Sequence, residues 1–526
     1  MSRFLPAQNS RDPFEILTST ADIPIIVVHS RRPNGRAMRQ RARRPKSLQS
    51  CTRTSVSLPI LVYSELERLA SKRNVSLAWV IRDAAERYVV DGGEQSSDGQ
   101  LGLGFSSALR RVTTRAEAKA HGLSHRVTGL FAGIGGIELG LQKAGHHAAL
   151  LCDNDPAAMA VLEAKFPTVP RHGDVITLDR VPKETTLVSA GFPCQDLSQA
   201  GTTKGIAGSR SGLVGEVFRL IRSSSTPWIL LENVPFMLQL AQGEAMNVIT
   251  SALEDLGYSW AYRVVDSRAF GLPQRRRRVY LIASNVADPR TILFADEAPS
   301  VPEREKNGHP VAYGFYWTEG LRGLGWAVDA VPTLKGGSTI GIPSPPAVLL
   351  TDGRIVTPAI EDAEMLQGFP RNWTKSAERV GKRTLRWKLV GNAVSVPASH
   401  WIGRRLRNPL PCLEFATRTM VDHRHWPTAA WNIGAGRTAV IASEFPIHSR
   451  RRSLESMIAE RATDLSARAT AGFLARASRA QLRFPAHFLP AVRAHLKRMQ
   501  STLSRDDRQA SSKVKSHYRR RTVGAT

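Results

Sequence analysis

The chain has 526 residues, enough for several domains, and 73 Lys and Arg against 45 Asp and Glu give it a formal charge of +28 at pH 7. No apolar run reaches the length of about 18 residues that a membrane span needs, and the four cysteines are too widely spaced to predict a disulfide framework or a zinc site. The charge excess favours nucleic acid over a membrane as partner. The cysteine usage favours a reducing, cytoplasmic location near the nucleoid.

The N-terminal part of the chain divides into a basic arm and a small structured unit. Residues 1–50 hold basic clusters with little periodicity and are expected to form a flexible arm. Within residues 51–92, the stretch from Arg53 to Leu58 alternates as a strand does, and apolar residues at helical spacing follow on both sides of Asn74-Val75-Ser76. One strand and two helices cannot close a core alone, so this unit is expected to form a homodimer.

The strand–helix–helix pattern of residues 51–92 resembles the ribbon-helix-helix DNA-binding domains. The resemblance implies that paired strands enter the major groove, where Arg53, Ser55 and Ser57 contact base edges. A helical hairpin that only dimerises is the alternative. Residues 93–125 are rich in Gly and Ser and are expected to form a linker.

From residue 126 onward, apolar strand-like runs alternate with helical patterns, which predicts an α/β fold with a doubly wound sheet. The first strand runs into a turn containing Gly133, Gly135 and Gly136, where backbone amides at a helix N-terminus can approach a ligand. Asp153 and Asp174 follow the next two strands at the same sheet edge, and a carboxylate there suits a ribose. Each acid alone could be a solvated residue, but the combination favours a nucleoside cofactor.

A cysteine follows the next strand. Residues 187–190 predict a buried strand, and the Gly191-Phe192-Pro193 turn would carry Cys194 out over the sheet edge as a candidate nucleophile. A small buried hydrophobe is the alternative. Glu232 ends the following strand and would face the same crevice, where a buried carboxyl can hold or donate a proton.

A basic run, Gln274-Arg275-Arg276-Arg277-Arg278, enters a further strand. Alternation would place Arg276 and Arg278 on one face, half buried, with a structural or ligand role.

Six motifs in one order resemble the DNA (cytosine-5)-methyltransferase family over residues 126–408. They are Phe131-Ala132-Gly133-Ile134-Gly135-Gly136, Pro193-Cys194-Gln195, Glu232-Asn233-Val234, Gln274-Arg275-Arg276-Arg277-Arg278, Glu364-Met365-Leu366-Gln367-Gly368-Phe369-Pro370 and Gly391-Asn392-Ala393-Val394. The resemblance implies a Rossmann-like, S-adenosylmethionine-dependent methyltransferase fold. The expected domains are a cofactor-binding and catalytic domain at 126–284, a target-recognition region at 285–353, and closing motifs at 354–409.

The resemblance also implies the chemistry. Cys194 attacks C6 of a flipped-out cytosine while Glu232 holds N3 and Arg278 holds O2, with Arg276 in the same catalytic set, and C5 then accepts the methyl group. The implied cofactor residues are Phe131 on the adenine, Gly133, Gly135 and Gly136 in the turn, Asp153 at the ribose, Asp174 at the adenine amino group, and Asn392 and Val394. Asp153 is shorter than the carboxylate common at its position, and no aromatic residue follows it.

Contacts with DNA are implied at two places. Gln195, Ser198, Lys204 and Arg210 lie in the loop after the nucleophile, which closes over DNA in this family. Thr333 and Lys335, in Thr333-Leu334-Lys335-Gly336-Gly337, resemble the family's recognition segment. The short region fits one short duplex target.

The C-terminal quarter extends beyond the family pattern. From residue 401 to the end there are about 24 Lys and Arg against 8 Asp and Glu, which predicts a basic helical extension at 410–500 and a disordered tail at 501–526. Leu465, Ala469, Phe473 and Leu474 form an apolar stripe at helical spacing. The stripe is either an ordinary packing face or part of an added DNA- or partner-binding module.

The function predicted from these residues is methylation of cytosine C5 in duplex DNA, either as the modification enzyme of a restriction–modification system or as an orphan or phage methylase. A cognate restriction endonuclease is a possible partner, and no metal is expected. One alternative is a transfer-RNA cytosine methyltransferase, because a branch of the family uses the same Cys and Glu. The other is a DNA-binding regulator whose methylase domain is secondary.

Overall fold

The computed structural model describes residues 123–193, 212–224, 226–299, 311–337, 343–420, 424–458 and 460–502. The arm, the unit at 51–92, Cys194 with its following loop (Gln195, Ser198, Lys204 and Arg210), and the tail beyond 502 lie outside these residues. Within the described ranges, no helix is long and apolar enough to cross a membrane.

A sheet of ten strands forms the larger part of the structure, in the order β14-β16-β15-β6-β8-β5-β4-β1-β2-β3. Five neighbouring strands, β3 to β5 in this order, run parallel, and the others pair antiparallel. The strands are β1 (Arg126–Leu130), β2 (His147–Cys152), β3 (Arg171–His172), β4 (Leu187–Ala190), β5 (Trp228–Asn233), β6 (Ser259–Asp266), β8 (Arg277–Ser284), β14 (Thr417–Thr419), β15 (Ala429–Asn432) and β16 (Thr438–Val440).

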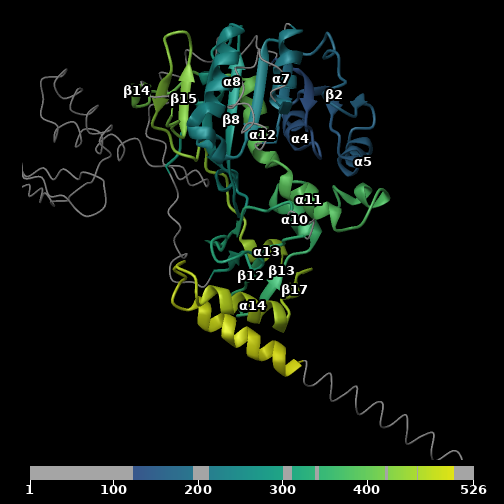
Figure 1. Cartoon of the computed structure of the whole chain (residues 1–526), viewed down its shortest axis with the longest axis vertical. Helices are drawn as coiled ribbons and strands as arrows, with labels where there is room; N and C mark the ends of the chain where they lie inside the picture. The colour runs from purple at the N-terminus through teal and green to yellow at the C-terminus, as the bar shows by residue number, and fades with distance from the viewer. Residues whose placement is uncertain are drawn as a thin grey trace, which may run out of the picture. The chain divides into compact units, whose positions relative to one another are not determined.

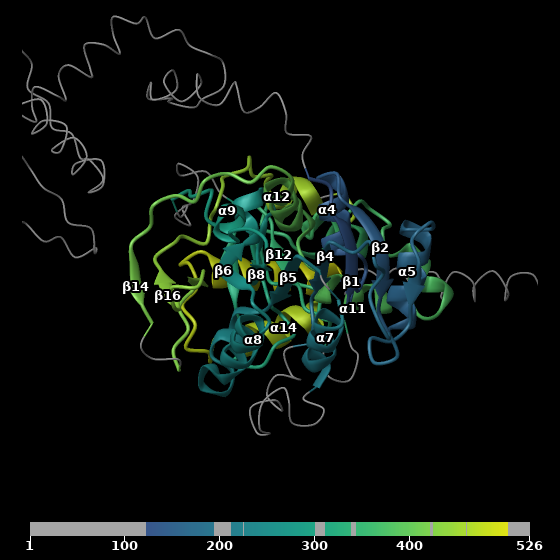
Figure 2. The same cartoon turned by 90° about the horizontal axis from the view of Figure 1, so that it is seen from above.

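Helices cover both faces of this sheet, as Figure 2 shows. On one face lie α4 (Gly136–Lys143), α9 (Arg290–Leu293) and α12 (Val396–Arg407), and on the other lie α7 (Gly212–Arg222) and α8 (Glu244–Asp255), while α5 (Pro156–Lys165) lies at the β2 end. Every residue of β4 and β5 is buried, as a parallel strand covered on both faces requires. The predicted doubly wound α/β fold is confirmed.

A smaller antiparallel sheet contains part of the predicted target-recognition region, residues 285–353. Its order is β10 (Trp326–Val328), β9 (Tyr313–Phe315), β12 (Ala347–Leu349), β13 (Ile355–Thr357) and β17 (Thr463–Asp464). In Figure 1, α10 (Ile360–Leu366) and α11 (Leu385–Asn392) lie between the two sheets. A two-stranded parallel pair, β7 (Gln274–Arg275) with β11 (Val331–Pro332), joins the basic run to the recognition region.

The C-terminal extension is not purely helical, which corrects the prediction for residues 410–500. Residues 417–440 add β14, β15 and β16 to the large sheet, with β15 pairing to β6. These strands have only three or four residues each, too few to show a clear alternation. Buried Arg263 fixes this segment, because its guanidinium donates to the carbonyls of Leu293, Asp296 and Ser443.

The remainder of the extension completes the small domain. Helices α13 (Leu454–Ile458) and α14 (Ala467–Ala477) follow, and β17 pairs with β13. Phe473 is buried against Phe315, with 4.6 Å between ring centroids, and Leu465 belongs to the same core. The apolar stripe is therefore a packing face of this small domain, which is the first of the two alternatives.

Two buried histidines lie where β1 and β2 begin. The backbone N–H of His125 donates to Nδ1 of His146 at 3.0 Å, so the Nε2–H of His146 donates to the Gly403 carbonyl at 2.8 Å. This arrangement requires a neutral His146. Burial, with the neighbouring His146, lowers the pKa of His125 to about 4, and burial lowers the pKa of His146.

Acidification should therefore destabilise the domain. Above about pH 6.5 both histidines are neutral whether folded or unfolded. As the pH falls towards 4, the unfolded chain takes up protons that the folded chain does not, so stability is lost in that interval. For His125 alone the free energy of unfolding should fall by about 2 kcal/mol between pH 7 and pH 5. Urea denaturation at both pH values checks this, and His125→Gln should lose much of the difference while exposed His147→Gln keeps it.

Candidate active site and cofactor cleft

The ends of β4 and β5 bring the predicted nucleophile turn next to Glu232. The parallel register pairs Ala190 with Leu231, so Gly191 and Glu232 are the next residues along the two strands. A Cβ placed on Gly191 would lie 3.3 Å from Oε2 of Glu232. The side-chain amide of Asn233 donates to the Phe192 carbonyl at 3.0 Å. The backbone that leads to Cys194 is thus fixed to the end of the strand that carries Glu232.

Glu232 and Arg278 form a nearly buried ion pair. Nε of Arg278 lies 2.9 Å from Oε1 of Glu232, and the two side chains are 12% and 9% exposed. Burial raises the pKa of Glu232, although Arg278 and Arg276 act in the opposite direction. A carboxyl group in this setting takes up a proton more readily than a solvated one. The guanidinium beside it can donate to a carbonyl oxygen of the same ligand.

Arg276 occupies a different place from the one predicted. Its side chain is fully buried and donates to the carbonyls of Leu334, Gly391 and Ala393. The predicted alternation fails because Arg276 lies between two strands, β7 and β8, and belongs to neither. We therefore place Arg276 outside the set of base-contacting groups, as a residue that positions the recognition segment and the end of α11.

The glycine turn has the conformation that a close ligand approach needs. After β1, Phe131, Gly133 and Gly135 have φ values of 54°, 55° and 76°, in the left-handed region that favours glycine. Gly135 is the N-cap of α4, with no side chain capping the helix. The amide of Gly133 donates to Asp153 and that of Gly135 to the Ala132 carbonyl, and half-buried Phe131 precedes them in the turn.

Asp153 follows β2 and is held by two backbone amides. Gly133 N–H donates to Oδ2 at 2.7 Å, and Asp155 N–H donates to Oδ1 at 2.9 Å. Burial raises the pKa of Asp153, and the two amides oppose that rise. Each oxygen keeps a second lone pair, so the carboxylate can still accept from ribose hydroxyls. Asp174 follows β3 at the same edge and accepts from the Ile176 amide at 3.0 Å.

Asn392 and Val394, both predicted to bind the cofactor, lie in different surroundings. Val394 is buried against the start of α4, where a Cβ on Gly136 would lie 2.8 Å from its Cγ2. Asn392 is exposed, and its Oδ1 lies 2.5 Å from the position of a Cβ on Gly336. Val394 therefore borders the predicted cofactor turn, whereas Asn392 borders the recognition segment.

The recognition segment, residues 333–336, is mounted through its backbone. Gln274 accepts the Leu334 N–H at 3.0 Å, and Tyr316 donates to the Thr333 carbonyl at 2.6 Å. The ammonium of Lys335 lies 4.2 Å from the centroid of the Tyr316 ring and 3.1 Å from Glu319. Thr333 donates to the Arg275 carbonyl at 2.9 Å.

Three contributing residues were not predicted as site residues. Gln274 and Gln367 join the basic run to α10 and α11, since Gln274 donates to Gln367 and Gln367 donates to the Val390 carbonyl. Both lie inside the quoted motifs, but nothing in residue type separates them from their neighbours. Glu138 lies under the glycine turn, accepts from Ser189 at 3.0 Å, and burial raises its pKa to about 7.

The described cysteine nearest the glycine turn is not a nucleophile. Cys152 is buried at the end of β2, and burial raises the pKa of its thiol to about 12, so it carries almost no thiolate at neutral pH.

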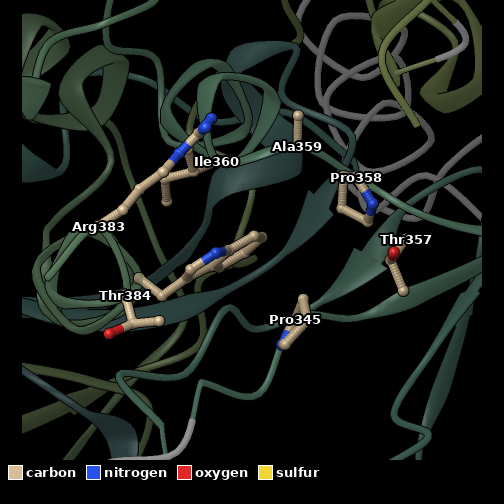
Figure 3. Close-up of a pocket in the computed structure, with 8 residues that line it drawn as sticks. Pro345, Thr357, Pro358, Ala359, Ile360, Arg383 and Thr384 are labelled. Carbon is tan, nitrogen blue, oxygen red and sulfur yellow. The ribbon is translucent and has the colours of Figure 1, made fainter. Parts of the chain in front are cut away.

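A pocket of about 310 Å³ opens elsewhere, between the start of α10, the start of α11 and Pro345 (Figure 3). Arg383 and Thr384 lie on one side, with Thr357 and Pro358 on the other, and Trp387 also lines the pocket. Arg383 is bound to Glu361 at 3.0 Å. The pocket shares no residue with the predicted active site or cofactor turn.

Comparison with known proteins agrees with this geometry. Residues 125–313 match the family described as C-5 cytosine-specific DNA methylase. The Type II methyltransferase M2.BsuMI of Bacillus subtilis is 48% identical over 370 residues, which cover 67% of this chain and 93% of that protein. The Type II methyltransferase M.MspI of a Moraxella species is 30% identical over 314 residues, covering 55% of this chain and 72% of that protein.

Among solved structures, a methyltransferase described as S. pombe Dnmt2 is 18% identical, with a TM-score of 0.38 over 53% of this chain and 97% of that chain.

The α/β fold and the family match define a methyltransferase. More specifically, the chain belongs to the C-5 cytosine-specific DNA methylase family and is a DNA (cytosine-5)-methyltransferase. The resemblance to this family is confirmed. The family match begins at residue 125, so the ribbon-helix-helix resemblance of residues 51–92 stays a prediction.

Replacing Glu232 with Gln should abolish most activity without unfolding the protein. Glutamine keeps the shape of the side chain but cannot transfer a proton, and lost general acid–base catalysis costs about 10²-fold or more in rate. Methyl transfer to a DNA substrate measures kcat. Glu254→Gln is the matched control, since Glu254 pairs with Arg437 at 2.8 Å on α8. Equal loss in both variants would contradict the assigned role.

Proposed function

We propose that the protein methylates C5 of a flipped-out cytosine in a specific duplex DNA site through a covalent Cys194 adduct. The observation that carries this proposal is the buried Glu232–Arg278 pair beside Gly191, in a chain of this family. One carboxyl with a raised pKa and one guanidinium match N3 and O2 of a cytosine. Gly191 is three residues before Cys194 in the sequence.

Each step balances with these residues. The Cys194 thiolate forms a bond to C6, and the electron pair of the C5–C6 double bond moves towards C5 as N3 takes a proton from Glu232. Arg278 stabilises the charge that develops at O2. Attack of C5 on the methyl group would break the methyl–sulfonium bond and release the donor as its thioether. Loss of the C5 proton to a solvent base then re-forms the C5–C6 double bond and expels the Cys194 sulfur, and N3 returns its proton to the Glu232 carboxylate.

The residues present fit S-adenosylmethionine as cofactor. The turn with positive φ values leaves backbone amides open at the start of α4, and the carboxylates of Asp153 and Asp174 stand at adjacent strand ends. Phe131, Gly133, Gly135, Gly136 and Val394 would surround the group. When bound, S-adenosylmethionine supplies an electrophilic methyl group.

Cys194→Ser tests the covalent step. A serine hydroxyl is a far weaker nucleophile than a thiolate near neutral pH, so methylation should fall by at least about 10³-fold. The adduct with DNA containing 5-fluorocytosine, visible on a denaturing gel, should disappear. Cys152→Ser is the control and should form the adduct. Methyl transfer at an unchanged rate by Cys194→Ser would overturn the mechanism.

We further propose that the protein is the modification enzyme of a restriction–modification system. Relatives named as Type II methyltransferases support this role. Bisulfite sequencing of DNA from cells that express the chain would give the target site, and a nuclease gene beside its own would identify the partner.

The unit at 51–92 is proposed to read DNA as a dimer and to add affinity to the methylase domain. Deletion of residues 1–95 should leave a folded enzyme, because the described domain has its own cores. DNA affinity should fall, and its dependence on salt should become less steep because fewer phosphates are neutralised. Fluorescence anisotropy at several salt concentrations measures both. An unchanged affinity and slope would argue against a DNA-reading unit.

A further inference from the structure

We infer that Lys388 is a positioning residue that couples the cofactor site to the recognition segment. Its side chain holds the acidic loop, residues 153–155, while its own backbone and the end of α11 press against residues 335 and 336. This inference rests on the proposed function, in which Asp153 binds the cofactor.

The acidic loop is braced from within and from α11. Asp155 caps α5 by accepting the amides of Ala157 at 2.8 Å and Ala158 at 3.3 Å, and its own amide donates to Asp153. Nζ of Lys388, 233 positions further along the chain, lies 2.8 Å from Oδ2 of Asp155. Burial acts to raise the pKa of Asp155, but the hydrogen bond from Lys388, with the backbone amides, lowers it. The loop that carries Asp153 is therefore tied to helix α11.

The C-terminal end of α11, which contains Gly391, is in contact with the recognition segment. A Cβ on Gly391 would lie 2.1 Å from the carbonyl carbon of Lys335 and 2.3 Å from the nitrogen of Gly336, so the two backbones touch. A Cβ on Gly336 would lie 3.3 Å from the carbonyl oxygen of Lys388 itself. Buried Arg276 holds Gly391 and Leu334 together.

These contacts form a short physical link. Lys388 and Gly391 are one helical turn apart, and buried Arg386 locks the helix to α10 through Glu364 at 2.9 Å. If cofactor binding shifts the acidic loop, the shift is passed through Lys388 and α11 to the contacts that hold the recognition segment. By reciprocity, DNA held at the recognition segment must favour one position of the acidic loop.

The role differs from simple stabilisation. The Lys388 side chain is 54% exposed, and exposed ion pairs contribute little to folding. Loss of the ammonium should therefore leave stability nearly unchanged while it loosens the acidic loop. Such a pair is also weakened by salt, which gives a second signature.

The test compares Lys388→Met with wild type, Lys388→Arg and Lys375→Met in the full chain. Lys375 is an exposed lysine that pairs with Glu378 at 2.8 Å, so it controls for loss of one surface ion pair. S-adenosylhomocysteine is the probe, and calorimetry measures its affinity with and without duplex DNA carrying the target site. Wild type should show an enhancement by DNA of about fivefold or more, the lower end of typical allosteric coupling.

Lys388→Met should lose most of that enhancement. Its KM for S-adenosylmethionine should rise more than its kcat falls, and its thermal midpoint should change little. At high salt, the enhancement by DNA in wild type should fall towards the value for Lys388→Met. Lys388→Arg should restore the enhancement. An enhancement unchanged in Lys388→Met, or equally lost in Lys375→Met, would overturn the inference. Because the probe is bound and not transferred, this result is independent of whether Cys194 forms the adduct.

Discussion

The arrangement of the cleft depends on the hydrogen bonds that the buried Arg276 guanidinium donates. A charge without water is tolerated only when other dipoles surround it, and here three carbonyls, from Leu334, Gly391 and Ala393, supply them. These carbonyls belong to the recognition segment and to the end of α11, whose backbones also touch at Gly391 and Gly336. Removal of Arg276 would take this donor from all three carbonyls, of which that of Ala393 keeps a bond from Gln367, at about 1–3 kcal/mol for each group left unsatisfied. The recognition segment and the cofactor cleft therefore share one anchor.

Much of the fold and of the site could be predicted because both depend on strand ends. Apolar runs mark the parallel strands, and the residue after each run lies at one edge of the sheet. This is why Asp153, Asp174 and Glu232 could be placed at one edge from the sequence, and why the structure finds them after β2, after β3 and at the end of β5. The pair of Glu232 with Arg278 follows from the neighbouring strand, since β5 and β8 are directly hydrogen-bonded.

Other features could not be read from local pattern. The direction of Arg276 depends on a break between β7 and β8 that leaves no trace in a run of four arginines. Strands β14 to β16 are defined by their partners, because β15 lies between β6 and β16 and pairs with both. The basic character of the last hundred residues suggested a separate module, yet Phe473, Phe488 and Leu465 fill the core of the recognition domain. Charge on the outer face of a helix gives no information on what its inner face covers.

The contacts that hold the recognition segment in place are made mainly to its backbone atoms. Arg276 and Gln274 bind the carbonyl and amide of Leu334, Tyr316 binds the Thr333 carbonyl, and Gly391 touches the main chain of Lys335 and Gly336. Main-chain atoms are the same for every residue type, so these contacts tolerate exchange of the exposed side chains around them. Exposed side chains of this segment can therefore be substituted while its backbone contacts with Gln274, Arg276 and Gly391 stay in place. Gly391 itself has no such freedom, because any side chain there would displace the segment.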